Sequence, residues 1–218
     1  MAFDFKKEMN ELYQPKAKPQ LVNVPAARYA AVRGKGDPNT PDGDYQRAIP
    51  MLYAAAYAVK NLSKSGEIAG GYDFTVPPLE GFWQQEGSAG ADLTKKENFS
   101  WISVIRLPDF VTKQDFERAV QTAERKKKIS LAQVELLQID EGLCVQIMHT
   151  GSFDSEAESV AAMESFIAAN GYENDLSESR LHHEIYLSDP RKTPEEKRRT
   201  VLRHPIRKLS PKGGAKGA

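Results

Sequence analysis

The apolar positions of the chain follow two different periods, and together they predict an alternation of strands and helices. Segments rich in Val, Ile, Leu and aromatic residues predict strands at residues 20–33, 72–85, 98–107, 141–150, 181–189 and 201–207. Apolar residues at steps of three and four predict helices at residues 45–63, from Thr112 onward and from Ser155 onward. A short amphipathic segment at residues 5–12 is expected to form a peripheral arm or a short helix.

The starts and ends of the two later helices carry local signals. Thr112 with Asp115, and Ser155 with Glu158, have the spacing of a capping box, in which two side chains satisfy free backbone N–H groups. Gly171 is expected to end the last helix.

Prolines leave two choices open. The helix at 45–63 contains Pro50, so either the helix begins near that residue or it bends there. Pro77 and Pro78 confine the 72–85 segment to a sheet edge or divide it into two pieces.

The order strand, turn, helix, strand, strand occurs twice, at about residues 20–110 and 140–208. This repeat predicts an α+β fold in which a duplicated βαββ unit forms one antiparallel sheet. Helices are expected on one side of the sheet, and a ligand cleft between the two halves on the other side. We expect all residues, 1–218, to form a single domain.

The strand at 181–189, LHHEIYLSD, places a carboxylate among aromatic residues. By alternation His182, Glu184 and Tyr186 share one face, while the other face carries Ile185 and Leu187, which are suited to packing on a helix. A lone carboxylate is costly to desolvate in a core, so Glu184 is expected either to line a pocket or to face water.

Composition narrows the class of protein. Of 218 residues 40% are hydrophobic, and 30 Lys and Arg balance 30 Asp and Glu, so the overall charge gives no argument for nucleic acid. From Arg191 to the end there are ten basic and two acidic residues, which suits a basic patch or a solvated, frayed terminus. No apolar run reaches the roughly 20 residues that span a bilayer, and no signal peptide is evident, so neither a membrane nor export is expected. A cytoplasmic location is expected.

The single cysteine, Cys144, allows no internal disulfide and is expected to be a small core residue. The Gly34 and Gly36 pair lacks the third glycine of a dinucleotide fingerprint, and there is no GxSxG, P-loop or HExxH motif. His182 and His183 point to opposite faces of a strand and cannot share one metal ion. We therefore expect no metal and no cofactor.

Four segments together carry a family resemblance: YAAVRGKGDPN, LYAAAYAVK, the GFW strand and HHEIYLSDPRKTPEEKRRTVLRHPI. From about residue 5 to 208 the chain resembles the gyrase-inhibitor-like (GyrI-like) small-molecule-binding family. This family resembles the effector-binding domains of multidrug-responsive regulators, in which a buried glutamate meets lipophilic cations. Glu184 matches that glutamate. No DNA-binding helix-turn-helix precedes the domain, so the resemblance is expected to extend to the pocket and not to the regulator function.

The resemblance also implies an activity, because some stand-alone members are similar to hydrolases of cyclopropanoid, DNA-alkylating cytotoxins. On that reading Glu184 is the general base for water. Trp83, Trp101 and Tyr186 form flat walls, and Tyr186 alternatively stabilises the developing phenolate. His182 is expected to hold Glu184 by a hydrogen bond.

Tyr53 and Tyr57, one helical turn apart, are either core aromatics by spacing or further substrate-binding residues. The expected partners are hydrophobic aromatic small molecules.

The sequence is compatible with two functions. The first is the hydrolase just described, and the second is a non-catalytic multidrug-binding protein in which Glu184 pairs with lipophilic cations. A gyrase-binding role is suggested only by the family name, and the sequence does not indicate an oligomeric state.

Overall fold

The computed structural model describes residues 2–85 and 96–209. The helices are α1 (Phe5–Glu8), α2 (Asn10–Tyr13), α3 (Asp44–Lys64), α4 (Lys113–Lys127) and α5 (Glu156–Ala169). The strands are β1 (Phe3–Asp4), β2 (Gln20–Val24), β3 (Ala27–Lys35), β4 (Phe74–Thr75), β5 (Leu79–Gln85), β6 (Phe99–Leu107), β7 (Glu135–Ile139), β8 (Gly142–Thr150), β9 (Tyr172–Asn174), β10 (His182–Tyr186) and β11 (Arg199–Lys208). No helix in these two ranges is both long enough and apolar enough to cross a membrane.

One large sheet organises the molecule, with the strand order β2-β8-β11-β10-β5-β6-β3-β7 and with β9 added beside β11. Neighbouring strands in this sheet are antiparallel. The units β3-α3-β5-β6 and β8-α5-β10-β11 have the same order along the chain. They join in the sheet where β5, the second strand of the first unit, pairs with β10, the second strand of the other. The α+β fold with a duplicated βαββ unit is therefore confirmed.

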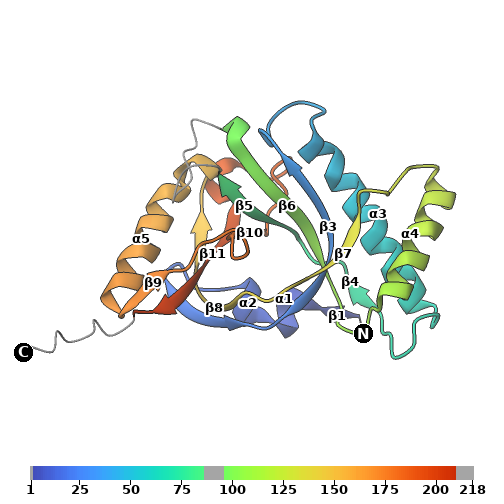
Figure 1. Cartoon of the computed structure of the whole chain (residues 1–218), viewed down its shortest axis with the longest axis horizontal. Coiled ribbons are helices and arrows are strands. Elements are labelled where there is room, and N and C mark those ends of the chain that lie inside the picture. The colour runs from blue at the N-terminus through green and yellow to red at the C-terminus, as the bar shows by residue number, and fades with distance from the viewer. Residues whose placement is uncertain (1, 86–95, 210–218) are drawn as a thin grey trace, which may run out of the picture.

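The two long helices of the repeat lie on one face of the sheet but leave its centre open. Helix α3 packs on β3 and β6, and α5 packs on β8, β9 and β11, so neither covers the central pair β5 and β10 (Figure 1). The cleft is lined by residues of both helices and of both central strands. The prediction that the cleft lies on the side away from the helices is wrong, because the gap between α3 and α5 is itself the cleft.

The opposite face of the sheet is covered near its centre by the N-terminal segment. Phe5 in α1 and Tyr13 in α2 are buried, and the Tyr13 hydroxyl donates a hydrogen bond of 2.9 Å to Glu80 on the far side of β5. Of the two alternatives for this segment, the short helix is confirmed, as the turns α1 and α2, and the segment belongs to the core rather than to the periphery. Its burial explains why this short stretch holds its helical turns without the length that an isolated helix needs.

Several predicted boundaries are refined. The segment 20–33 is two strands that leave Pro25 between them, with β2 pairing with β8 and β3 pairing with β6. The 72–85 segment is broken at Pro77 and Pro78 into β4 and β5, which is one of the two choices left open. Helix α3 begins at Asp44 and runs through Pro50, which lies inside it.

The two predicted capping boxes have different outcomes. The box of Thr112 and Asp115 is present at the start of α4, with both reciprocal hydrogen bonds. Ser155 makes no capping bond, because a preceding 3-10 turn brings the carbonyl of Ser152 within 2.8 Å of its hydroxyl, which donates there instead. Gly171 follows α5 with a φ of 74°, a conformation that glycine adopts without strain.

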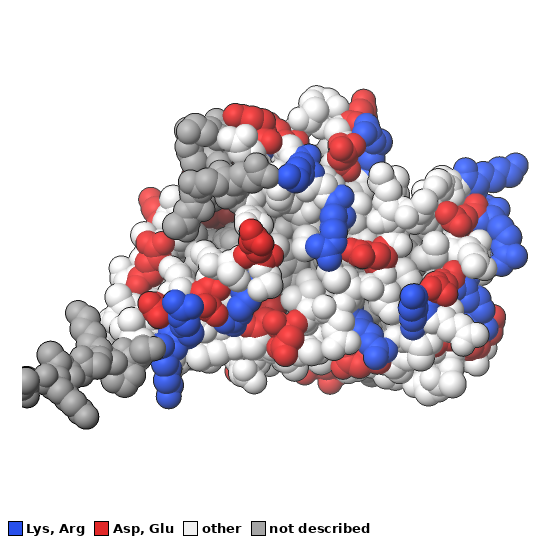
Figure 2. Space-filling view, in the orientation of Figure 1, with Lys and Arg blue, Asp and Glu red and all other residues white. Residues whose placement is uncertain are grey.

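The charges on the surface are mixed in sign. On the face shown in Figure 2, acidic and basic side chains are interspersed, with cations gathered over the last turn of α4. The basic segment from Arg191 onward is not a frayed end over its described part, because residues 199–208 form β11 and Arg203 is only 1% exposed. Residues 210–218 of that segment lie outside the described ranges. Cys144 is fully buried, which confirms it as a core residue.

Candidate functional site

The cleft between α3 and α5 has a volume of about 1830 Å³. Strands β5 and β10 form its floor, and the two helices form its walls. Small-molecule sites commonly enclose roughly 300 to 1,000 Å³, so this cleft has room for an extended ligand.

Strand β10 presents three functional side chains to the cleft, as its alternating pattern predicts. His182, Glu184 and Tyr186 all line the cleft, while His183 and Ile185 are buried on the other face of the sheet. In the antiparallel pairing with β5, His182 lies opposite Trp83 and Glu184 lies opposite Gly81. The cross-strand neighbour of Glu184 therefore has no side chain.

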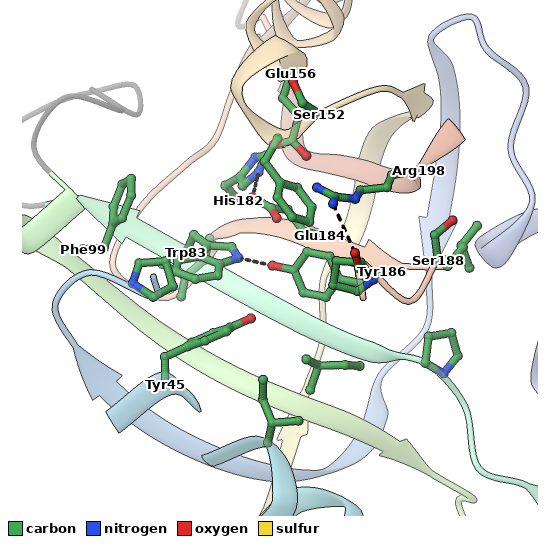
Figure 3. A pocket seen from close by; sticks show the side chains of 18 of the residues that line it. Tyr45, Trp83, Phe99, Ser152, Glu156, His182, Glu184, Tyr186, Ser188 and Arg198 are labelled. Atoms are coloured by element: carbon green, nitrogen blue, oxygen red, sulfur yellow. Dashed lines mark hydrogen bonds and ion pairs between the residues drawn. The ribbon is translucent and has the colours of Figure 1, made fainter. Parts of the chain in front are cut away.

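Tyr186 and Trp83 are joined across the two central strands. Nε1 of Trp83 donates a hydrogen bond of 2.9 Å to the hydroxyl oxygen of Tyr186 (Figure 3). Since the indole N–H is only a donor, the phenol oxygen accepts, and the hydroxyl hydrogen of Tyr186 is left to donate elsewhere. Burial, with the nearby Glu184 carboxylate, raises the pKa of Tyr186 well above its usual value, so this hydroxyl keeps its proton.

An aromatic stack extends from the floor toward α3. The ring of Tyr45 lies between Trp83 and Trp101, with centroids 5.3 and 5.2 Å away, and its contact with Trp101 is edge to face. Trp101 is 2% exposed and is not among the residues that line the cleft. The aromatic wall of the cleft therefore consists of Trp83 and Tyr45. Trp101, which was expected in this wall, packs behind Tyr45 instead.

Tyr53 and Tyr57 both line the outer part of the cleft from α3, although their spacing is equally typical of a core. Their rings are 6.4 Å apart, and Tyr57 is 48% exposed. The structure thus brings six of the seven expected site residues to the cleft, and Trp101 is the exception.

Glu184 is held by a chain of two imidazoles. Nε2 of His182 lies 3.1 Å from Oε1 of Glu184, and Nδ1 of His182 lies 2.7 Å from Nε2 of His204. Burial and the neighbouring His182 lower the pKa of His204 to about 3, so this imidazole is neutral at ordinary pH. Both contacts are satisfied when His204 donates to His182 and His182 donates to Glu184.

Glu156 is a site residue that the sequence analysis missed. It lies in the first turn of α5, is 8% exposed, and enters the cleft on the side of His182 and Glu184 (Figure 3). One oxygen or nitrogen of each of these three side chains lies within 4.8 Å of the other two. Burial, followed by the charges of Glu184 and Asp154, raises the pKa of Glu156 well above its usual value.

The same strand carries a polar network on its other face. The ring nitrogens of His183 lie 3.0 Å from Glu80 and 3.0 Å from Glu141, and Arg203 bonds the other oxygen of Glu141 at 3.0 Å. The imidazole also stacks on Phe82, with ring centroids 4.0 Å apart. These contacts hold β10 on the face that points away from the cleft, and they leave its cleft face to Glu184.

Comparison with known proteins agrees with this architecture. The chain is similar over 94% of its length to a conserved protein of Listeria innocua without assigned function, with 46% identity, full coverage of that chain and a TM-score of 0.87. It is also similar to a structure described as a hydrolase from Listeria innocua, with 44% identity, 94% and 100% coverage and a TM-score of 0.84. The C-terminal domain of EcmrR, at 14% identity, a TM-score of 0.53 and coverages of 88% and 98%, shares the fold.

No curated protein matches the sequence. Residues 17–207 match the GyrI-like small-molecule-binding domain, which spans most of the chain. The chain therefore belongs to the GyrI-like small-molecule-binding domain family.

Proposed function

We propose that the protein binds hydrophobic, planar or electrophilic small molecules in this cleft and hydrolyses cyclopropanoid-type cytotoxins. The observation that carries the proposal is the position of Glu184, bonded to His182 on the floor of a cleft walled by aromatic rings. The similarity to a structure described as a hydrolase, at 44% identity, supports a hydrolytic reaction.

The reaction needs a base for water and a donor for the oxygen that becomes a phenolate. Glu184 takes a proton from water as the water oxygen bonds to the ring CH₂ of a cyclopropane fused to a dienone. The strained C–C bond breaks, and its electron pair moves through the dienone to the carbonyl oxygen, which becomes a phenolate. Aromatisation of the product drives the step, and Glu184 then returns its proton to solvent or product.

Tyr186 is suited to the second role. Its oxygen accepts from Trp83 and its O–H faces Glu184, so in this role the O–H turns from that carboxylate to the developing phenolate. Its raised pKa keeps the proton in place until the charge develops. Trp83 and Tyr45 offer flat surfaces that orient a planar ligand for attack.

The proposal is tested by product analysis. The protein is incubated with a spirocyclopropyl-dienone substrate in isotopically labelled water, and the products are examined by mass spectrometry. We expect a product with one added water that carries the label, together with quenching of Trp83 fluorescence on binding. Quenching without any hydrated product would contradict the hydrolase.

A second candidate is a non-catalytic protein that sequesters lipophilic cations. It is favoured by the two carboxylates, Glu156 and Glu184, that face one aromatic cleft. In that case Glu184→Gln should weaken the binding of cationic dyes strongly and leave neutral aromatics unaffected. Equal losses for both classes of ligand would count against it.

A further inference from the structure

We propose that Glu156, His182 and Glu184 form a binding site for a divalent transition-metal ion of the Zn²⁺ class. This site goes beyond the proposed turnover, and it can be measured without any substrate.

The three side chains reach one point from two elements. His182 and Glu184 are two residues apart on β10 and so share its cleft face, and Glu156 comes from the first turn of α5 above them (Figure 3). One candidate ligand atom from each lies within 4.8 Å of the others. Small side-chain rotations would bring such atoms to the roughly 2.0 to 2.2 Å that Zn²⁺ takes from nitrogen and oxygen.

The state of Glu156 is an independent indication that something else binds here. Among the residues described, Oε1 of this buried side chain has no hydrogen-bond partner. An ionised carboxylate would be buried beside a second carboxylate without a compensating charge, and a protonated one would bury an O–H with no acceptor. A cation between Glu156 and Glu184 removes both difficulties.

The donor types select the class of ion. Two carboxylates suit many divalent cations, but an imidazole ligand favours Zn²⁺ and its transition-metal neighbours over Mg²⁺ and Ca²⁺. The other ring nitrogen of His182 lies 2.7 Å from Nε2 of His204. With an ion at Nε2, His182 would donate its Nδ1–H to His204, which is the usual second contact of a ligating histidine.

His182 and His183 do point to opposite faces, as the strand pattern predicts. The further ligand comes from helix α5, which no spacing within the strand indicates. A bound ion would also occupy the carboxylate of Glu184, so Zn²⁺ is expected to inhibit the turnover proposed above.

The test is calorimetric titration of the full chain after dialysis against a chelator, with Zn²⁺ and separately with Mg²⁺. We expect one Zn²⁺ per chain and no comparable binding of Mg²⁺. Glu156→Gln and Glu184→Gln each remove one charged ligand and should weaken Zn²⁺ binding by about tenfold or more. Glu158→Gln, an exposed residue in the same turn of α5, is the matched control and should bind as the parent does.

Circular dichroism establishes that each variant is folded before titration. Absence of Zn²⁺ binding by the parent chain would overturn the site. Binding that neither Glu156→Gln nor Glu184→Gln weakens would overturn it too. Because no substrate is present, these results are independent of whether the hydrolase proposal holds.

Discussion

At the scale of single residues, the orientation of Glu184 and of Tyr186 is set by the neighbouring side chains that bond them. Glu184 is oriented by His182, and the oxygen of Tyr186 is occupied by Trp83. A carboxylate and a phenol in water would be a weak base and an undirected donor. In this cleft His182 fixes the direction of the carboxylate, Trp83 fixes that of the phenol, and the two groups face each other.

Tyr186→Phe tests the proposed donor. The change removes the O–H that meets the phenolate and leaves the N–H of Trp83 without its acceptor. We expect turnover to fall about 100- to 1,000-fold, as for other single oxyanion donors, with ligand affinity changed by only a few-fold. Steady-state kinetics with binding measured by fluorescence would check this.

The control for that change is Tyr72→Phe, which removes a hydroxyl from a residue that is 43% exposed and outside the cleft. It should leave turnover unaltered. If the Tyr186 and Tyr72 variants had the same rates, the donor role would be untenable.

Sequence reasoning found Glu184 but not Glu156, and the reason is physical. Alternation along a strand indicates which residues share a face, so the sequence predicts that His182, Glu184 and Tyr186 lie together. Glu156 stands in the first turn of a helix, where an acidic residue is ordinary because it complements the helix dipole. Only the packing of α5 on β8, β9 and β11 brings this side chain into the cleft beside His182 and Glu184.

At the scale of elements, the pairing of β5 with β10 sets the geometry of the cleft floor. The register places Gly81 opposite Glu184, between Trp83 and Tyr186. A Cβ at this position would lie 2.6 Å from Nε1 of Trp83 and 2.9 Å from the hydroxyl of Tyr186. The absence of a side chain at Gly81 is therefore what allows these two rings to meet.

Gly81→Ala should separate the two rings. We expect loss of the bond between Trp83 and Tyr186, a shifted Trp83 emission, and turnover reduced toward that of Tyr186→Phe. Overpacking of this kind costs about 1 to 3 kcal/mol, so the protein should remain folded with a lower melting temperature. Emission and turnover identical to those of the parent would show that the close approach has no function.

The order of the elements was predictable from the sequence, because helical and strand periods are local. Which strands pair with each other was harder to predict, because pairing joins segments far apart in the chain. Residues 20–33 look like one strand, yet β2 joins β8 and β3 joins β6, in different halves of the sheet. The same limit applies to Trp101, since a strand pattern does not say whether Tyr45 or solvent covers its ring.

At the scale of the whole molecule, the buried network below the floor ties the two halves together. Glu80 comes from β5, His183 from β10, Arg203 from β11 and Glu141 from the position just before β8, while Tyr13 comes from α2. None of these polar contacts is evident from composition. They depend on five separate segments that meet only in the folded chain.

This network predicts a loss of stability in acid. Burial alone would raise the pKa of Glu141, but His183 and Arg203 outweigh it and lower the pKa from 4.5 to about 2. A lowered folded pKa stabilises the protein above pH 4.5, and that contribution is lost as the pH falls toward 2. The loss is of the order of 3 kcal/mol, measured by urea unfolding at successive pH values.

Glu141→Gln should lack this acid-dependent loss, while being less stable by about 3 to 5 kcal/mol at neutral pH because Arg203 stays buried without its partner. Glu135→Gln is the matched control, since that glutamate pairs with Arg33 at the surface. It should change stability by about 1 kcal/mol or less. An acid loss in Glu141→Gln equal to that of the parent would rule out Glu141 as its source.

The central claim is that Glu184 activates water, and the most direct test is the turnover of a cyclopropanoid substrate by Glu184→Gln. The amide keeps the shape of the carboxylate but cannot take a proton from water. We predict that this variant binds the substrate within a few-fold of the parent and forms no detectable hydrated product. Turnover equal to that of the parent would contradict the account.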